Sequence, residues 1–320
     1  MTEKIALKDV GEFGFLERIA PKLQKRAGTK LGIGDDCAVL ETLQSPVVTL
    51  DTLVENAHFR RDWIENHSSP RALGWKSLAV SVSDLAASGA KPVAAFVSLG
   101  APPSENFAFV EELYAGMEAC AARFGFTIAG GDTVSSPILT ISATLVGELF
   151  APRPLLRSGA QIGDIVSMSG PLGMGAAGLF LLQNPKFQNF TGAQTLLKSH
   201  FEPSPRLELV QKIAPQIGAA LDISDGISSD ARHIAKASGV RLEIEISRVP
   251  MTRETRELAE LAGQNPLEWA LAGGEDYEIL ACSAREIAGF TPIGRVVAGE
   301  GVTFLENGKE VEISMGWRHF

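Results

Sequence analysis

The stretch SPRALGWKSLAVSVSDLAASG, residues 69–89, decides the fold that we expect. Ser69 is a good N-cap, Pro70 suits the first turn of a helix, and Gly89 is a typical residue at a helix end. A narrow polar stripe follows this helix among apolar residues, at positions i, i+4, i+7 and i+11: Ser77, Ser81, Asp84 and Ser88. Because the rest of the helix is apolar, it must be buried on most sides by other layers of structure.

Strand-like runs and helical patterns extend from this helix in both directions. The N-terminal half has a second helical pattern, which follows Ser104 and Glu105 and ends near Gly125, and four strand-like runs: 47–52, 93–99, 126–133 and 138–149. After a stretch with prolines and glycines at 150–164, strands (165–170, 219–224, 241–246, 277–283) and helices (from about 173, 204–214, 226–238) follow again. For 320 residues we predict an α/β (α+β) protein of two domains, 1–150 and 151–320.

Composition excludes several function classes. Hydrophobic residues make up 45% of the chain and charged residues 21%. No window of about 18 uninterrupted apolar residues is present to span a bilayer. The N-terminus MTEKIALKDVGEF lacks the features of a secretory signal, so we expect a cytoplasmic protein that does not contact a membrane. Cys37, Cys120 and Cys282 are far apart and fit neither a disulfide framework nor a zinc site.

The charge balance bears on the partners. The chain has 29 basic and 38 acidic residues and a formal net charge of −9. No run of Lys or Arg provides a surface that follows nucleic-acid phosphates, so we expect no nucleic-acid partner. An acidic protein binds anionic phosphates when divalent cations lie between its carboxylates and the ligand.

Acidic residues occur where apolar runs meet glycine turns. Asp84 lies on the polar stripe of the buried helix, where an ionised carboxylate requires a cation or several hydrogen-bond donors. Other acids open or follow strand-like runs: Asp35, Asp36, Asp51, Asp132, Asp222, Asp225, Glu275 and Asp276. Taken singly, each is explained by turn chemistry, and Asp84 by bonds to backbone or serine hydroxyls. Taken together, they predict carboxylates that converge at one cleft.

An all-oxygen site suits Mg²⁺, which takes one or two carboxylates per ion and completes its shell with water and substrate phosphates. Zinc requires His and Cys ligands, and the five histidines show no paired spacing: His58, His67, His200, His233 and His319. The sequence has no GxxxxGK[ST] loop, no HRD or DFG element and no GxSxG elbow. GMGAAG at 173–178 matches GxGxxG but lacks an acidic residue about 20 positions on, which favours helix entry and close packing over dinucleotide binding.

Nine motifs occur in a fixed order over nearly the whole chain: GEFGFLERI (11–19), GIGDDCAVL (32–40), TLDTLVENAHF (49–59), KSLAVSVSDLAASGAKP (76–92), AGGDT (129–133), LLRSGAQIGD (155–164), LDISDGISSDARHI (221–234), LAGGEDYEIL (271–280) and GWRHF (316–320). With them the chain resembles the thiamine-monophosphate kinase family, in the superfamily of aminoimidazole ribonucleotide synthetase and selenophosphate synthetase. The segments DTLVENAHF and GGEDYE favour the kinase over its superfamily relatives.

The resemblance implies a two-domain fold like that of aminoimidazole ribonucleotide synthetase and a homodimer built through the N-terminal domains. It further implies that ATP and thiamine monophosphate bind in a cleft between the domains with several Mg²⁺ ions. The γ-phosphate would pass directly, in line, to the substrate phosphate and give thiamine diphosphate in thiamine biosynthesis.

The resemblance also implies roles for individual residues. Mg²⁺ would be bound by Asp36, Thr49, Leu50, Asp51, Asp84, Asp132, Asp222 and Asp225. ATP would contact Tyr114, Gly131, Asp132, Arg157 and Ser224. The thiamine moiety would face His58, Glu275 and Trp317. Catalysis would depend most on Asp36, Asp225 and Arg157.

The chemistry of such a transfer needs no general base. A phosphate monoester has a second pKa of about 6, so the attacking oxygen is largely ionised at neutral pH. Catalysis then consists of positioning and of neutralising two polyanions, which carboxylate-held Mg²⁺ and the guanidinium of Arg157 supply. Two other functions remain open at this point: a non-enzymatic sensor of Mg²⁺-nucleotide, and a superfamily synthetase that acts on another phosphorylated metabolite.

Overall fold

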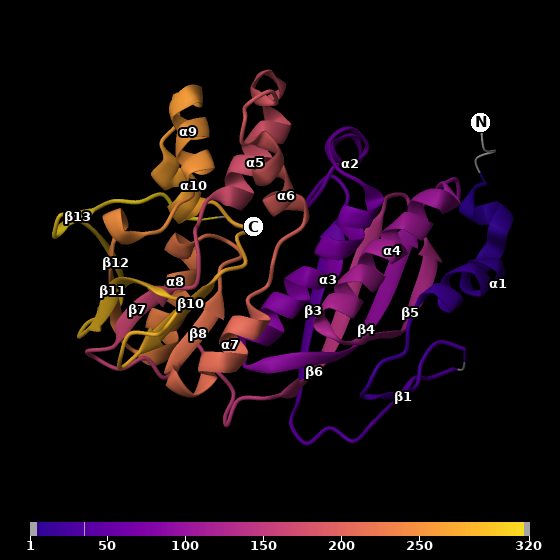
Figure 1. Cartoon of the computed structure of the whole chain (residues 1–320), viewed down its shortest axis with the longest axis horizontal. Helices are drawn as coiled ribbons and strands as arrows, with labels where there is room; N and C mark the ends of the chain where they lie inside the picture. Colours follow the sequence, from indigo (N-terminus) through magenta and orange to yellow (C-terminus); the bar gives the residue numbers. More distant parts are fainter. Residues whose placement is uncertain (1–4, 35, 317–320) are drawn as a thin grey trace. The chain divides into compact units, whose positions relative to one another are not determined.

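The structure is a computed structural model and describes residues 5–34 and 36–316. The chain divides into two compact units, which are coloured along the sequence in Figure 1. Unit 1 comprises Met1–Leu85 and Ala90–Leu149, and unit 2 comprises Ala86–Gly89 and Phe150–Phe320.

Unit 1 is built on a four-stranded sheet of order β3-β6-β4-β5, as far as the described residues show. Its strands are β3 (Pro46–Val54), β4 (Ala90–Ala101), β5 (Thr127–Ser135) and β6 (Thr140–Leu149). The β4–β5 pair is parallel and the other pairs are antiparallel. A short hairpin of β1 (Thr29–Leu31) and β2 (Val39–Leu40) precedes them. The helices are α1 (Leu7–Ile19), α2 (Arg61–His67), α3 (Pro70–Ala87) and α4 (Phe107–Phe124).

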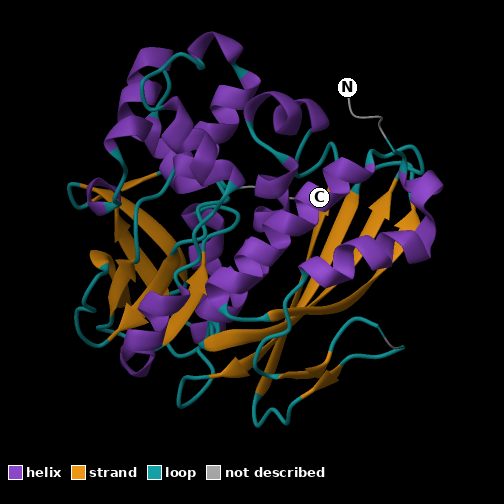
Figure 2. Cartoon of the chain, turned by 45° about the vertical axis from the view of Figure 1, so that its right-hand side comes forward, coloured by secondary structure: helices purple, strands orange, loops and turns teal. Residues whose placement is uncertain are grey.

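Helices α3 and α4 lie on one face of this sheet (Figures 1 and 2). The two helices approach very closely, since a Cβ added at Gly74 would lie 1.9 Å from the carbonyl oxygen of Leu113. A Cβ at Gly116 would lie 1.8 Å from the carbonyl oxygen of Arg71. Only glycine at both positions permits this backbone contact, and α3 is buried along most of its length.

The other face of the unit 1 sheet carries exposed apolar side chains. Side chains alternate between the two faces of a strand, so Val48 and Leu50 share a face of β3. They are 61% and 62% exposed, and Val134 on β5 is 49% exposed. We call these three residues the open sheet face.

Unit 2 contains, within its described residues, a seven-stranded sheet of order β13-β12-β9-β11-β7-β10-β8. Its strands are β7 (Ile165–Met168), β8 (Ala219–Asp222), β9 (Arg241–Glu245), β10 (Ile279–Ser283), β11 (Thr291–Val297), β12 (Gly301–Glu306) and β13 (Lys309–Val311). The β12–β9 pair is parallel and the other pairs are antiparallel. The helices are α5 (Met174–Gln183), α6 (Ala193–Phe201), α7 (Leu207–Ile213), α8 (Ile227–Ser238), α9 (Arg253–Ala262) and α10 (Pro266–Ala272). A large apolar core between this sheet and α8 includes Val166, Leu242 and Ile234.

The helix expected after Ser104 and Glu105 is confirmed: α4 starts at Phe107, and the side chain of its cap Asn106 accepts from the Ala108 N–H at 3.2 Å. One strand expectation needs correction. The strand expected after Asp36 is only the two-residue β2, which pairs with β1 at two positions with an irregular register between them. No helix in the described ranges combines the length and apolar character that crossing a bilayer requires.

Candidate functional site

Two predicted metal ligands of unit 1 lie on neighbouring elements, and each accepts a hydrogen bond from the element that carries the other. Asp51 on β3 and Asp84 on α3 form what we call the acid pair. The Oγ of Ser81, which is fully buried, donates to Oδ2 of Asp51 at 2.6 Å, and Oγ1 of Thr49 donates to Oδ2 of Asp84 at 2.5 Å. Ser81 and Asp84 of the predicted polar stripe therefore face β3 in a buried to half-buried seam, as expected, and a hydroxyl group donates to each carboxylate.

Burial shapes the electrostatics of the acid pair. Enclosure of the Asp51 carboxylate raises its pKa above the usual value, while the hydrogen bond from Ser81 and the charge of His58 act in the opposite direction. His58, a predicted substrate residue, lies in the loop after β3, and its Nδ1 accepts from the Val54 N–H at 3.1 Å. A positive charge near Asp51 therefore favours the ionised form, so the site suits a cation.

The register of the sheet relates the acid pair to predicted ATP-binding residues. Asp51 is aligned with Ala143 on β6, with Val97 on β4 and with Gly131 on β5. Asp132 belongs to the next row and lies opposite Ser98. Asp132 is exposed, and its Oδ1 accepts from the N–H of Thr133 at 2.8 Å.

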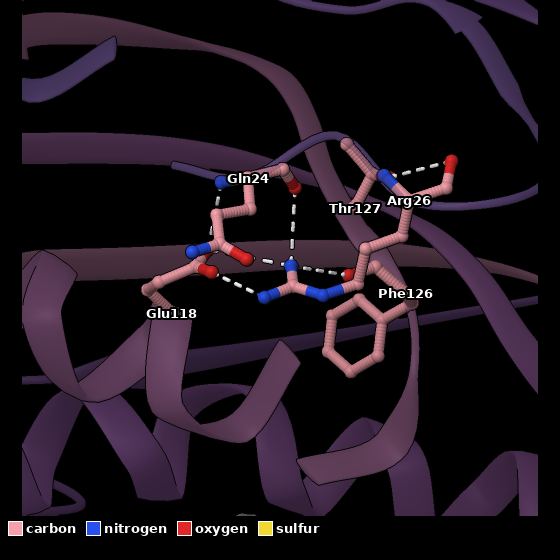
Figure 3. Close-up of polar contacts among 5 residues, drawn as sticks. All are labelled: Gln24, Arg26, Glu118, Phe126 and Thr127. Atoms are coloured by element: carbon pink, nitrogen blue, oxygen red, sulfur yellow. Dashed lines mark hydrogen bonds and ion pairs between the residues drawn. The ribbon is translucent and has the colours of Figure 1, made fainter. Parts of the chain in front are cut away.

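Asp36 is exposed in the turn between β1 and β2, and Asp35 lies outside the described residues. The chain that enters this hairpin is fixed by Arg26 (Figure 3). The Arg26 guanidinium pairs with Glu118 on α4 and donates to the carbonyl oxygen of Phe126 at 2.9 Å. The Arg26 N–H donates to Oγ1 of Thr127 at 2.8 Å. These contacts tie the base of the Asp36 hairpin to α4 and to the start of β5.

Tyr114, the residue expected near the adenine, is buried on α4. Its ring packs edge-on against Phe15 with 5.6 Å between ring centroids, and burial raises the pKa of its hydroxyl. The side chain thus belongs to the interior of unit 1, and its contact with adenine stays a prediction.

In unit 2 the predicted residue Asp222 ends β8, and the predicted residues Ser224 and Asp225 follow it before α8; we call Asp222–Gly226 the acidic turn. Oδ2 of Asp230, on the first turn of α8, accepts from the N–H groups of Ser224 and Asp225 at 3.1 and 3.0 Å. Burial raises the pKa of Asp230 to about 7. A buried carboxylate therefore fixes the backbone of the acidic turn.

Arg157, the predicted catalytic arginine, lies near this turn. It is exposed, and its carbonyl oxygen accepts from Oγ of Ser238 on α8 at 3.0 Å. Burial raises the pKa of Asp230, and the positive charge of Arg157 acts against this rise; burial lowers the pKa of His233, and the charge of Arg157 lowers it further. The guanidinium is thus within electrostatic reach of the carboxylate that holds the acidic turn.

Glu275, a predicted substrate residue, is brought to the same place. Its N–H donates to the carbonyl oxygen of Ser224 at 2.8 Å, and its φ of 64° is left-handed. A Cβ at Gly274 would lie 2.2 Å from that same carbonyl oxygen, so glycine is required there. Oε2 of Glu275 lies 3.1 Å from Nδ1 of His200 on α6.

Asp276 does not join the acids of the acidic turn, which corrects the expectation that it helps to line a common cleft. Its carboxylate accepts from the N–H groups of Gly173 and Gly175 at 2.8 and 3.1 Å. Burial raises the pKa of Asp276 to about 7. GMGAAG is thus confirmed as a helix entry, because a side chain of the protein caps the start of α5.

Trp317 lies outside the described residues, so its predicted contact with thiamine stays a prediction. Gly316 packs on the acidic turn, since a Cβ there would lie 2.1 Å from the carbonyl oxygen of Asp225. Among the described residues, no group of three or more His, Cys, Asp or Glu side chains is already arranged to hold a metal ion. The predicted ligands instead form smaller sets that offer only oxygen donors.

The sequence analysis assigned no role to His200 or Asp230, and it did not predict that Asp276 caps a helix. Asp230 has a readable signal, because an acid in the first turn of a helix after Ser-Asp-Gly is typical of a cap. His200 has no such local signal, because its partner Glu275 lies far away in the sequence.

Comparisons with known proteins cover both units. The family model "AIR synthase related protein, N-terminal domain" matches residues 34–149, and the corresponding C-terminal domain model matches 161–306. Thiamine-monophosphate kinase of Aquifex aeolicus is 38% identical over 98% of this chain and 99% of its own. A solved structure described as AaThiL complexed with AMPPCP and TMP is 38% identical, covers 100% of both chains and has a TM-score of 0.80. The thiamine-monophosphate kinase structure from Stenotrophomonas maltophilia is 31% identical, covers 97% of this chain and 99% of that chain, and has a TM-score of 0.82.

Proposed function

The chain belongs to the thiamine-monophosphate kinase family, and from this we propose that it transfers the γ-phosphate of ATP to thiamine monophosphate, giving thiamine diphosphate and ADP. The observation that carries the proposal is the 38% identity over the full length of a structure that holds AMPPCP, an ATP analogue, together with TMP. The proposal names a phosphotransferase, and a synthetase acting on another metabolite is not supported by these relatives.

The residues of the chain supply positioning and charge. The substrate phosphate is already largely ionised at neutral pH, its second pKa being about 6, so no side chain has to remove a proton from it. Arg157 offers a guanidinium that binds phosphate oxygens in a fixed geometry. Glu275 offers a carboxylate to the cationic thiazolium, and His58 an aromatic face. Direct, in-line transfer then depends on holding the two phosphates together.

We propose Mg²⁺ as the metal that this reaction needs. The residues fit it, because the acid pair offers hard oxygen donors and the burial of Asp51 leaves a carboxylate for which a cation is a suitable partner. In unit 1 the proposed holders are the carboxylates of Asp36, Asp51, Asp84 and Asp132 with an oxygen of Thr49 and the main-chain oxygen of Leu50, and in unit 2 they are Asp222 and Asp225. When bound, Mg²⁺ supplies neutralisation of the phosphate charges.

We propose a homodimer through the open sheet face. Val48, Leu50 and Val134 are exposed together, and apolar side chains in such an arrangement gain from being covered. Val48→Asp is expected to give a monomer in sedimentation velocity. Leu261→Asp on α9, where the wild-type side chain is 60% exposed, serves as the control and is expected to leave the mass unchanged. An unchanged mass of Val48→Asp would contradict this interface.

We keep the cytoplasm as the proposed location, because Cys37, Cys120 and Cys282 are all unbridged thiols in the described chain. Detection of the protein in the cytosolic fraction of its host tests this.

The central experiment is an assay of the purified protein with ATP, Mg²⁺ and thiamine monophosphate. Thiamine diphosphate and ADP are the expected products, in equal amounts. A folded protein that binds ATP but forms no product would support the alternative of a Mg²⁺-nucleotide sensor. Replacement of thiamine monophosphate by thiamine distinguishes a phosphate acceptor from a hydroxyl acceptor, and no product is expected from thiamine.

A further inference from the structure

The contact between His200 and Glu275 has no assigned role. The imidazole of His200 is almost completely enclosed, with 3% of the side chain exposed, whereas the side chain of Glu275 is 27% exposed. Nδ1 of His200 lies 3.1 Å from Oε2 of Glu275 and 3.2 Å from the carbonyl oxygen of Gly175. A buried group thus contacts a carboxylate that solvent and ligands can reach.

The chemistry of the two partners fixes the proton. A carboxylate and a backbone carbonyl are both acceptors, so Nδ1 of His200 has to carry hydrogen to bond to them. Hydrogen bonds to ionised acceptors are about twice as strong as those between neutral groups. The Nδ1–H group therefore restrains the direction in which the Glu275 carboxylate points.

The backbone on both sides of this contact is also fixed. A Cβ at Gly178 on α5 would lie 2.7 Å from Cβ of His200, so α6 packs closely on α5 at this point. A Cβ at Gly175 would lie 2.7 Å from the carbonyl oxygen of Glu275, and the Glu275 N–H is held by Ser224. Neither residue can shift without moving a packed helix or the acidic turn.

We propose that His200 is a positioning residue that orients the carboxylate of Glu275 toward the cationic part of thiamine monophosphate. The inference rests on the proposed function, because it assigns the direction of a carboxylate that the proposal places at the thiamine moiety. His200 does not touch the substrate in this account. It acts by reducing the orientations of Glu275 that compete with the productive one.

The test compares three single variants in steady-state kinetics. His200→Leu removes the donor and is expected to raise the KM for thiamine monophosphate about 10-fold, with the KM for ATP within about twofold of wild type. His200→Asn places an amide N–H near the position of Nδ1 and is expected to restore the KM to within about threefold. Phe201→Leu on the same helix, where the wild-type ring packs edge-on against His200, is the control for lost packing and is expected to leave both KM values unchanged.

A double variant separates positioning from an independent effect. Glu275→Gln combined with His200→Leu is expected to bind thiamine monophosphate no more weakly than Glu275→Gln alone, because His200 acts only through Glu275. The proposal would be overturned if the fold-changes in affinity of the two single variants multiplied in the double variant. Equal increases in both KM values, or an Asn variant as impaired as the Leu variant, would also overturn it.

Two further measurements keep the outcome decisive. If His200→Leu does not fold, as judged by its thermal midpoint, His200→Gln replaces it, because the Gln amide reaches the position of Nε2 and not that of Nδ1. Equal KM values for the Asn and Gln variants would then overturn the proposal. If the wild type forms no thiamine diphosphate, the proposed function fails. The role of His200 is then tested by calorimetric binding of thiamine monophosphate with AMPPCP and Mg²⁺, in which the affinity should fall from wild type to His200→Asn to His200→Leu.

Discussion

The carboxylates at the candidate sites of the two units accept hydrogen bonds from different kinds of donor. In unit 1, hydroxyl groups of Thr49 and Ser81 donate to the carboxylates of the acid pair, and these residues lie on regular strand and helix. In unit 2, the carboxylate of Asp230 is the acceptor, and the donors are backbone N–H groups of the acidic turn. A carboxylate is thus the proposed ligand group in unit 1, and in unit 2 a buried carboxylate supports the backbone of the proposed ligands.

This difference determines how each unit responds when one hydrogen-bond partner is removed. Exchange of a hydroxyl donor for a cation changes the partner of Asp51 or Asp84 and leaves the strand and helix intact. Loss of the Asp230 acceptor leaves two backbone N–H groups without it and changes the path of the chain that carries Asp225. Substitutions in unit 1 should therefore affect metal dependence, and substitutions around the acidic turn should affect geometry.

The largest expected effect is that of Asp51→Asn. The amide keeps the size of the side chain and removes the charge that balances the cation, so we expect turnover to fall by about 10²-fold or more. The Mg²⁺ concentration for half-maximal activity should rise in parallel, as measured by a Mg²⁺ titration at saturating ATP. Asp62→Asn is the control, because Asp62 forms a surface pair with Arg60 and should change neither value. A loss of turnover with unchanged Mg²⁺ dependence would contradict the role of the acid pair.

Asp230→Ala tests the other half of the comparison. Loss of both backbone contacts should disorder the acidic turn and lower kcat/KM about 30-fold, with little change in the Mg²⁺ concentration for half-maximal activity. Asp230→Asn keeps an acceptor oxygen for the same N–H groups, so its kcat/KM should stay within about threefold of wild type. If the Asn variant is as impaired as the Ala variant, the charge of Asp230 matters and not its hydrogen bonds.

The same contrast explains how much could be predicted from the sequence. The polar stripe of α3 follows from local periodicity, and so its buried seam with Asp84 was predicted and is confirmed. The motifs identified the family, and the comparisons confirm it. Pairings between distant positions leave no local signal, so Asp276 was grouped with the cleft acids although it caps α5. The contact between His200 and Glu275 was missed for the same reason.

Two of the short helices, α2 and α10, were missed. Each has 7 residues, which leaves an amphipathic pattern little room to repeat, although α7, also of 7 residues, was predicted from its apolar spacing. Helix α10 still carried a local sign, Asn265 followed by Pro266, where the Asn side chain accepts from the Leu267 N–H at 3.0 Å. Local capping chemistry could thus have found α10, and no comparable cap side chain marks α2.

Ser81→Ala sharpens the comparison with a smaller effect. The Ala variant removes the donor to Asp51 and leaves the carboxylate in place, so the Mg²⁺ concentration for half-maximal activity should rise about 10-fold. The kcat at saturating Mg²⁺ should remain within about threefold, because the metal then fixes the carboxylate. Ser77→Ala is the matched control, since Oγ of Ser77 donates to the carbonyl oxygen of Gly74 in its own helix at 2.8 Å. Equal effects of both variants would show that the packing of α3 matters and not the contact with Asp51.

The smallest expected effect is on stability, at the second capping carboxylate of unit 2. Burial raises the pKa of Asp276 in the folded protein to about 7, from an ordinary value of 3.8. Between these pH values the folded protein binds more protons at this site than the unfolded chain, so this group's contribution to stability falls as the pH rises toward about 7. Asn does not titrate, so Asp276→Asn should lose less stability than wild type as the pH rises from 3.8 to about 7. The amide has one acceptor oxygen where the carboxylate has two, and this difference is the same at every pH.

The difference in thermal midpoint between Asp276→Asn and wild type, without nucleotide or Mg²⁺, should therefore move in favour of the variant by a few degrees between about pH 5 and about pH 8. The Asp230 titration is common to both proteins and cancels in this difference. For Asp62→Asn the same difference should be flat, because the pKa of Asp62 is lowered and the group is ionised throughout. A flat difference for Asp276→Asn as well would mean that its carboxylate is solvated when ionised. That result would contradict the enclosure of the Asp276 carboxylate at the start of α5.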